Sequence, residues 1–133
     1  MYKTFQDMPV WQSAMSLAEM IFNLSDRLPK KEDYSLTSQV RRSALSISGN
    51  IAEAYGRKHT LDKLKFYYVA RGSLTETQSH LVYGYRVGYF KKEHVQEMEK
   101  MLNSLHNDIN KIIKSLANSD TRENLSQNRK TLT

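Results

Sequence analysis

Apolar residues recur at alternating steps of three and four positions in four separate stretches of the chain. Such steps place the apolar side chains on one face of an α-helix. The pattern is clearest over residues 92–117, where a seam typical of coiled coils consists of Val95, Met98, Leu102, Leu105, Ile109, Ile112 and Leu116. Weaker versions of the same pattern predict helices over about residues 8–27, 35–56 and 61–86.

Turn residues separate these four stretches. Pro29 is followed by the charged run KKED, Gly56 ends the second stretch, and Gly88 lies in the turn after the third. Because the connections are short, consecutive helices must run antiparallel. We therefore predict an all-α protein in which residues 1–117 form an antiparallel up-down-up-down four-helix bundle. Residues 118–133 carry two leucines in sixteen positions, which leaves a flexible tail and a marginal helical extension both open.

The stretch QVRRSALSISGNIAEAYGR, Gln39–Arg57, mixes small and polar residues into a predicted helix. Facing residues of two antiparallel helices keep a nearly constant sum of residue numbers, and the turn near Lys58 and His59 sets that sum. Within about one turn, the rule pairs Ser46 with Gly72, Gly49 with Val69, Arg42 with Glu76, and Glu53 with Lys65.

These pairs predict a structural lock between the second and third helices. Small residues let two backbones approach closely, and we expect Gly72 where they nearly touch. An ion pair between Arg42 and Glu76 would fix the register, because a slipped alignment leaves both charges unpaired. The residues of this predicted lock are Arg42, Ser46, Gly49, Asn50, Glu53, Gly72, Ser73 and Glu76.

Catalysis and metal binding are weaker interpretations of the same residues. Glu53 and Glu76 would lie some 17 Å apart, beyond the ~5–10 Å that paired-carboxylate hydrolysis requires. A carboxylate-bridged iron site in a bundle requires Glu-x-x-His on two helices, and the sequence has none. The absence of cysteine excludes disulfides, thiolate metal sites and a cysteine nucleophile. We expect no enzymatic activity, no cofactor and no metal.

The charge of the chain is moderately basic, with 20 Lys and Arg against 14 Asp and Glu, a net charge of +6. The excess is spread over residues 29–133 without a dense run, so weak nucleic-acid binding and simple solubilisation are both open. The candidate nucleic-acid-binding residues are Arg41, Arg57, Lys58, Arg71, Arg86, Lys91 and Lys92.

Aromatic residues gather on the third predicted helix and the turn after it, namely Tyr67, Tyr68, Tyr83, Tyr85, Tyr89 and Phe90. Neighbouring helices cover only part of a helix surface, so some of these rings must face outward. Exposed tyrosines could stack on nucleobases or be covered by a second subunit, and we favour the subunit.

Three segments carry a family resemblance: VWQSAMSLAEMIF, YSLTSQVRRSALSISGNIAEAYGR and KFYYVARGSLTETQSHL. In this order they resemble the bacterial four-helix bundle proteins of 23S rRNA intervening sequences, over about residues 5–117. The residues of the signature are Ser38, Gln39, Arg41, Arg42, Ser46, Asn50, Ile51, Ala52, Glu53, Arg57, Ala70, Gly72, Ser73 and Glu76. Ala54 departs from the family, which usually has glycine after its Ala-Glu.

The resemblance implies a left-handed antiparallel bundle that assembles as a ring of five subunits and has no known enzymatic activity. A more distant similarity, to the accessory protein of diversity-generating retroelements, implies a basic pentamer that engages nucleic acid and a reverse transcriptase. A ring of five would raise the charge from +6 to about +30.

We therefore expect a non-enzymatic homopentamer that offers a basic surface to RNA or DNA. A purely structural or protein-recruiting adaptor is the alternative. The opening MYKTFQDMPVWQ shows no basic segment followed by an apolar run, and no apolar run approaches the ~18 residues of a membrane span. The expected location is the cytoplasm, without a membrane partner.

Overall fold

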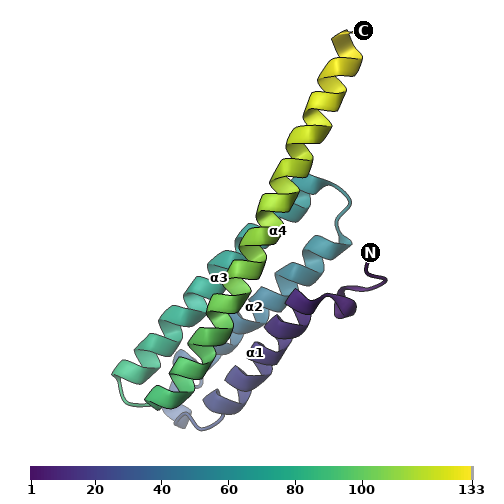
Figure 1. The fold of residues 1–133 in the computed structure, drawn as a ribbon. Coiled ribbons are helices and arrows are strands. Elements are labelled where there is room, and N and C mark those ends of the chain that lie inside the picture. The colour runs from purple at the N-terminus through teal and green to yellow at the C-terminus, as the bar shows by residue number, and fades with distance from the viewer. Residues whose placement is uncertain (133) are drawn as a thin grey trace.

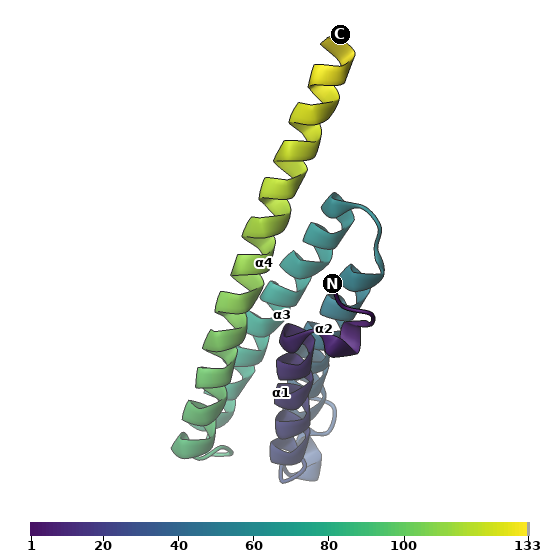
Figure 2. The same cartoon turned by 45° about the vertical axis from the view of Figure 1, so that its right-hand side comes forward.

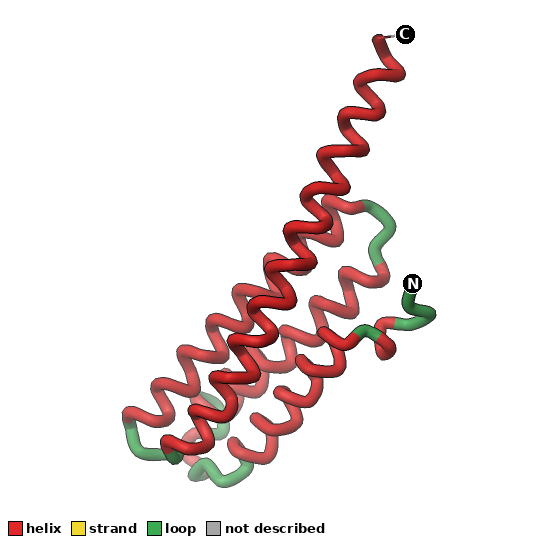
Figure 3. The backbone as a smooth tube through the Cα atoms, in the orientation of Figure 1, coloured by secondary structure: helices red, strands yellow, loops and turns green. Residues whose placement is uncertain are grey.

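The structure, a computed structural model that describes residues 1–132, contains four α-helices joined by short turns (Figure 1). Their bounds are α1 Pro9–Ser25, α2 Leu36–Gly56, α3 Thr60–Arg86 and α4 Lys92–Leu132, with 3-10 turns at Phe5–Asp7 and Lys30–Glu32. Each helix runs opposite to the one before it, as the turned view and the backbone tube also show (Figure 2, Figure 3). The predicted all-α, up-down-up-down bundle is confirmed, and α1, α2 and α3 end within two residues of their predicted bounds.

The core lies along the common axis of the bundle and receives side chains from every helix. Those that are at most 1% exposed include Ala14, Leu17 and Ile21 of α1, Val40, Ile47 and Ile51 of α2, Leu74 and Leu81 of α3, and Leu102, Leu105 and Ile109 of α4. Each fully buried aliphatic side chain stabilises the fold by roughly 1.5–3 kcal/mol, so this core supplies most of the driving force for folding. Within residues 1–132, no helix carries an apolar stretch long enough to cross a bilayer.

The seam of α4 follows the predicted positions from Val95 to Ile109 and then departs from them. Ile113 is buried at the next step, whereas the predicted Ile112 is only partly buried. A straight helix has 3.6 residues per turn, so a seam that repeats every 3.5 residues drifts by ~20° per heptad. After two heptads the drift brings the following residue into the core, which corrects the prediction at Ile112.

The turn between α3 and α4 depends on two glycines. Gly88 has a φ of 89°, in the left-handed region that glycine adopts without strain. The amides of Tyr89 and Phe90 donate to the carbonyl oxygen of Gly84 at 2.8 and 3.2 Å, which turns the chain back onto α3. The buried Phe90 ring lies against Gly84, where a Cβ atom would overlap it. The glycine that lets two elements approach closely is therefore Gly84.

The close approach predicted at Gly72 is wrong. Gly72 is exposed, and a Cβ atom built there meets nothing within 4 Å. Its neighbour Ser73 faces α2 instead, and because a helix turns by about 100° per residue, Gly72 points away from the interface. Gly49 of α2 is likewise exposed, with nothing within 4 Å of a built Cβ.

Residues 118–132 continue α4 beyond the ends of the other helices (Figure 1, Figure 2). Residues 121–131 are all exposed, and hydrogen bonds such as that from Thr121 Oγ1 to the Ala117 carbonyl, at 3.1 Å, stay within the helix. A flexible tail and a helical extension were both open, and the structure has the helix. An existing helix extends without a new nucleation step, which lets α4 continue past the other helices. Thr133, the last residue of the predicted tail, lies outside the described residues.

Candidate functional site

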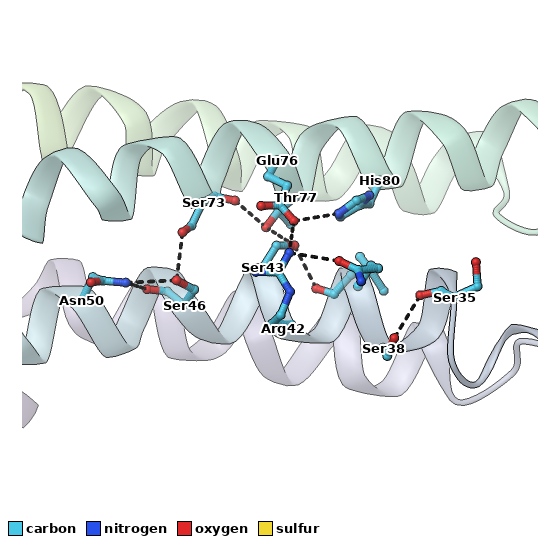
Figure 4. A network of polar contacts seen from close by, with 12 residues as sticks. Ser35, Ser38, Arg42, Ser43, Ser46, Asn50, Ser73, Glu76, Thr77 and His80 are labelled. Carbon is cyan, nitrogen blue, oxygen red and sulfur yellow. Dashed lines mark hydrogen bonds and ion pairs between the residues drawn. The ribbon is translucent and has the colours of Figure 1, made fainter.

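Hydroxyl groups connect α2 and α3 through a chain of hydrogen bonds (Figure 4). Ser73 Oγ donates to Ser46 Oγ at 2.9 Å, and Asn50 Nδ2 donates to the Ser46 hydroxyl and carbonyl oxygens at 2.9 and 2.7 Å. One turn along, Thr77 Oγ1 lies 2.9 Å from Ser43 Oγ, and both residues are fully buried. The polar residues that interrupt the apolar face of α2 therefore make the contact with α3.

The predicted Arg42–Glu76 ion pair forms at the edge of this interface. Glu76 Oε2 also lies 3.0 Å from His80 Nε2, and Arg42 Nη2 donates to Gln39 Oε1 at 3.0 Å. The hydrogen bond from His80 lowers the pKa of Glu76 most strongly, and Arg42 lowers it further, while desolvation opposes both. The side chains of Arg42 and Glu76 are 57% and 38% exposed, so the pair contributes only about 0–1 kcal/mol.

The other predicted residues of the lock divide into two groups. Ser46, Asn50 and Ser73 lie in the α2–α3 interface, whereas Gly49 and Gly72 lie outside it. Glu53, expected opposite Lys65, pairs with Arg57 of its own helix at 2.7 Å.

The Ser43–Thr77 contact was not predicted as a pair. Thr77 follows Ser73 by one helical turn, so the same facing rule extended by one turn contains the signal for it. The side-chain rotations that bring the two hydroxyls together are not visible in the sequence.

Three of the candidate nucleic-acid-binding arginines are engaged within the bundle. Arg41 donates to Ser25 Oγ at 2.7 Å and lies over the Phe22 ring. Arg71 donates to Asn110 Oδ1 at 3.0 Å and lies over the Tyr68 ring. Arg57, besides its ion pair with Glu53, lies over the Phe66 ring. These contacts occupy the guanidinium groups with partners on the protein itself.

The remaining candidates lie at opposite ends of the bundle, so the structure does not unite the predicted set. Lys58 is in the turn from α2 to α3, whereas Arg86, Lys91 and Lys92 are at the turn from α3 to α4. The α3–α4 turn shares its end of the bundle with the α1–α2 turn, as Figure 1 and Figure 2 show. The up-down topology alone predicts this proximity, because the first and third turns of such a bundle lie at the same end.

A hydrogen bond ties these two turns together. Tyr89 Oη donates to Glu32 Oε2 at 3.0 Å, and the backbone amide of Leu36 donates to Glu32 Oε1 at 3.4 Å. Desolvation raises the pKa of Tyr89, and the hydrogen bond to Glu32 raises it further. Glu32 thus holds the start of α2 close to the α3–α4 turn.

The surface formed by the two turns is called here the basic end, and its cations are Lys30, Lys31, Arg86, Lys91 and Lys92. All five are exposed, and none forms an ion pair with another described residue. With Arg27 included, residues 26–35 and 86–93 hold six Lys and Arg against four Asp and Glu, and one of those carboxylates, Glu32, is held by Tyr89. Tyr34 of the same end is 98% exposed.

Two hollows in the surface bear on binding. The α3–α4 hollow, beside the basic end, measures about 320 Å³ and is lined by Val82, Tyr85, Arg86, Lys92, Val95, Gln96 and Glu99. The α1–α2 hollow is largely apolar and is lined by Met15, Ala18, Glu19, Phe22, Arg41 and Leu45.

The predicted outward aromatics are confirmed for Tyr68, Tyr83 and Tyr85, which are exposed, whereas Tyr67 and Phe90 are buried. Over residues 1–132, no three histidine, aspartate or glutamate side chains converge as metal ligands would.

A family model described as 23S rRNA-intervening sequence protein matches residues 6–111 of the chain. The chain is also similar to a solved structure from Bacteroides thetaiotaomicron, described as a protein with unknown function from the S23 ribosomal protein family. The TM-score is 0.74 at 24% identity, and the match covers 79% of this chain and 98% of that one. No curated protein sequence matches this chain. The family resemblance carried by the three segments is confirmed, and the end of α4 lies outside the matched range.

Proposed function

We propose a function for this chain, which belongs to the 23S rRNA-intervening sequence protein family. It is a non-enzymatic bundle that assembles as a cytoplasmic homopentamer and binds RNA or DNA through its basic end. The observation that carries this proposal is a set of five exposed cations, none ion-paired with a described residue, at two turns held together by Tyr89 and Glu32.

The exposed cations of the basic end can contact phosphate at a lower cost in free energy than the engaged arginines elsewhere on the bundle. A cation without a protein partner contacts phosphate without breaking an existing ion pair, and each phosphate contact releases a bound counterion. Arg41, Arg57 and Arg71 already use part of their hydrogen-bonding capacity within the protein, so each gains less from a phosphate contact. The basic end is therefore the surface where contact with a polyanion gives the largest gain in binding free energy.

Assembly supplies the charge density that one chain lacks. The net charge of +6 on one chain is modest, and a ring of five would carry about +30. The α1–α2 hollow supports self-association, because Phe22 and Leu45 beside it are 54% and 60% exposed. Several weak basic ends on one ring bind a long polyanion with a higher effective concentration than isolated chains.

The absence of an enzymatic activity is part of the proposal and rests on the carboxylates. Glu53 is held by Arg57, and Glu76 is held by Arg42 and His80. Both carboxylates are paired with a side chain of the bundle, an arrangement typical of a structural ion pair rather than of a general acid.

An adaptor that recruits a protein is the second candidate, and the α1–α2 hollow is the observation that favours it. An apolar surface with two large exposed side chains is typical of a protein contact. A reverse transcriptase is one such partner implied by the distant similarity to retroelement accessory proteins. Under this candidate the cations of the basic end serve solubility alone.

Filter binding with a labelled RNA at ~50 mM salt separates the two candidates. The test variant replaces Lys30, Lys31, Lys91 and Lys92 with glutamine. The matched control replaces four exposed lysines elsewhere, Lys65, Lys100, Lys111 and Lys114, and so removes the same charge.

We expect the test variant to lose at least tenfold more affinity than the control. Equal losses would remove the basic end as the binding surface, and undetectable binding by the unmodified protein would favour the adaptor. Light scattering on the same samples tests the pentamer, and a 15.5 kDa monomer would contradict it.

A further inference from the structure

We infer that the α3–α4 hollow is a seat for one unpaired nucleobase, and that the partner of the basic end is therefore a single-stranded nucleic acid. This inference rests on the proposed function and specifies its substrate class. It is carried by the place of the hollow, by the chemistry of its lining and by its size.

The hollow is continuous with the basic end because Arg86 and Lys92 belong to both. Arg86 ends α3 and Lys92 begins α4, so the two cations line the hollow where it meets the turn. A strand whose phosphates contact these two side chains has its bases within reach of the hollow. Phosphate contacts position the strand, and the hollow receives a base that projects from the strand.

The lining offers one aromatic ring and an apolar floor. Tyr85 is 45% exposed, so part of its ring is available for stacking, while the valines Val82 and Val95 supply aliphatic surface. Stacking of a base on an aromatic side chain is tolerant of sequence and is the usual way in which proteins hold unpaired bases. A polar rim of Gln96 and Glu99 adds hydrogen-bonding groups.

Glu99 determines which part of a nucleotide enters. Its carboxylate repels phosphate, and no described cation forms an ion pair with it, so the base rather than the backbone is the part that fits. A carboxylate accepts a hydrogen bond from the exocyclic amino group of cytosine, whereas thymine has at the same ring position a carbonyl oxygen, which the carboxylate repels. The seat therefore prefers cytosine to thymine.

The size of the hollow excludes a duplex. At about 320 Å³ it lies at the lower limit of the ~300–1,000 Å³ typical of small-molecule sites, which accommodates one nucleotide. In a duplex each base is stacked and paired, and bringing one into the hollow would require unpairing it. A duplex can contact the cations of the basic end but cannot fill the seat.

Fluorescence anisotropy with the full chain at ~50 mM salt tests the seat, using three probes of equal length: oligo(dC), oligo(dT) and a mixed-sequence duplex. Tyr85→Ala removes the stacking ring. The matched control is Tyr68→Ala, which removes a tyrosine of similar exposure from the same helix, far from the turn. Both positions are on the surface, and thermal unfolding verifies that the variants fold.

We expect Tyr85→Ala to weaken binding of oligo(dC) about tenfold and of the duplex less than twofold, with Tyr68→Ala near the unmodified protein. A second pair, Glu99→Gln and the control Glu97→Gln, isolates the base preference from the change in charge. Glu99→Gln should reduce the ratio of oligo(dC) to oligo(dT) affinity, whereas Glu97→Gln should leave that ratio unchanged.

The outcomes distinguish this inference from the function on which it rests. Equal losses on single strand and duplex in Tyr85→Ala, or equal losses in both tyrosine variants, would overturn the seat and leave nucleic-acid binding in place. No binding of any probe by the unmodified protein would overturn both. A selective loss in Tyr85→Ala, together with the change of ratio in Glu99→Gln, would establish the seat.

Discussion

The interface of α2 with α3 and the seam of α4 stabilise the bundle in different ways. The described residues that α4 buries are all apolar, from Val95 to Ile113, whereas α2 also buries Thr37, Ser43 and Ser48. An apolar seam gains free energy in proportion to the area it buries and changes little if a helix slips by one repeat. Buried hydroxyls such as Ser43 and Thr77 each bond a carbonyl of their own helix, but they meet each other across the interface in one register only. The seam of α4 therefore drives folding, and the polar interface of α2 with α3 specifies the alignment.

The largest expected effect is at the seam. Leu102→Ala should lower the free energy of unfolding by about 2–5 kcal/mol, because Leu102 is fully buried and the surrounding core cannot fill the space. Leu125→Ala, in the exposed extension of the same helix, should change it by less than ~0.5 kcal/mol. Urea denaturation measures both, and similar losses would show that the extension is packed in solution.

The next largest effects are expected at the two glycines of α3, where the same substitution by alanine should change the stability in opposite directions. Gly84→Ala should destabilise the protein by about 1–3 kcal/mol, because the new methyl group displaces the Phe90 ring. Gly72→Ala should stabilise it by about 0.5–1 kcal/mol, since the site is open and alanine favours a helix. Melting temperatures of the two variants test the assignment, and a loss of stability in Gly72→Ala would restore the close contact predicted there.

The hydroxyl pair should give a smaller but coupled effect. Thr77→Val and Ser43→Ala should each cost about 0.5–1.5 kcal/mol, since each removes the hydrogen bond across the interface while the remaining hydroxyl keeps a carbonyl of its own helix. The double variant should cost less than the two together, with a coupling of about 0.5–1.5 kcal/mol. Strict additivity in this double-mutant cycle would mean that the two hydroxyls do not cooperate in setting the register.

The smallest effect concerns the exposed ion pair. Glu76→Gln should cost about 0–1 kcal/mol near neutral pH, because both partners are partly solvated. Since the folded-state pKa of Glu76 is lowered, its contribution is present above the unfolded-state pKa and is lost as pH falls through the folded-state pKa. Urea denaturation at about pH 7 and about pH 3 should show the difference from the unmodified protein shrinking at the lower pH. A difference that grows in acid would contradict this account of Glu76.

Much of the fold could be predicted because helix periodicity is a local signal. The steps from Val95 to Ile109 and the breaks at Pro29 and Gly88 determine four helices and their directions, and the facing rule finds the Arg42–Glu76 pair. Rotation about a helix axis is determined by packing, so the rule placed Gly72 on the wrong side. The close contact at Gly84 depends on a ring six residues later that folds back through a turn, which no periodicity contains.

The candidate site was less accessible from sequence for the same reason. Residue type identified the arginines, but only the structure shows that Arg41, Arg57 and Arg71 are engaged. Lys30 and Lys31 were not among the candidates, because the charged run KKED was interpreted only as the turn after the first helix. The hydrogen bond of Tyr89 to Glu32 that joins the two turns depends on side-chain placement.

The salt dependence of nucleic-acid affinity tests the central claim most directly, which is that the basic end binds phosphate. For a single-stranded probe, the logarithm of the affinity should fall linearly with the logarithm of salt concentration, with a slope of ~0.7 for each phosphate contact. Replacing Lys30, Lys31, Lys91 and Lys92 with glutamine should flatten that slope by up to about 3, whereas the control set on Lys65, Lys100, Lys111 and Lys114 should leave it nearly unchanged. Equal slopes for the unmodified protein and the basic-end variant would contradict the account.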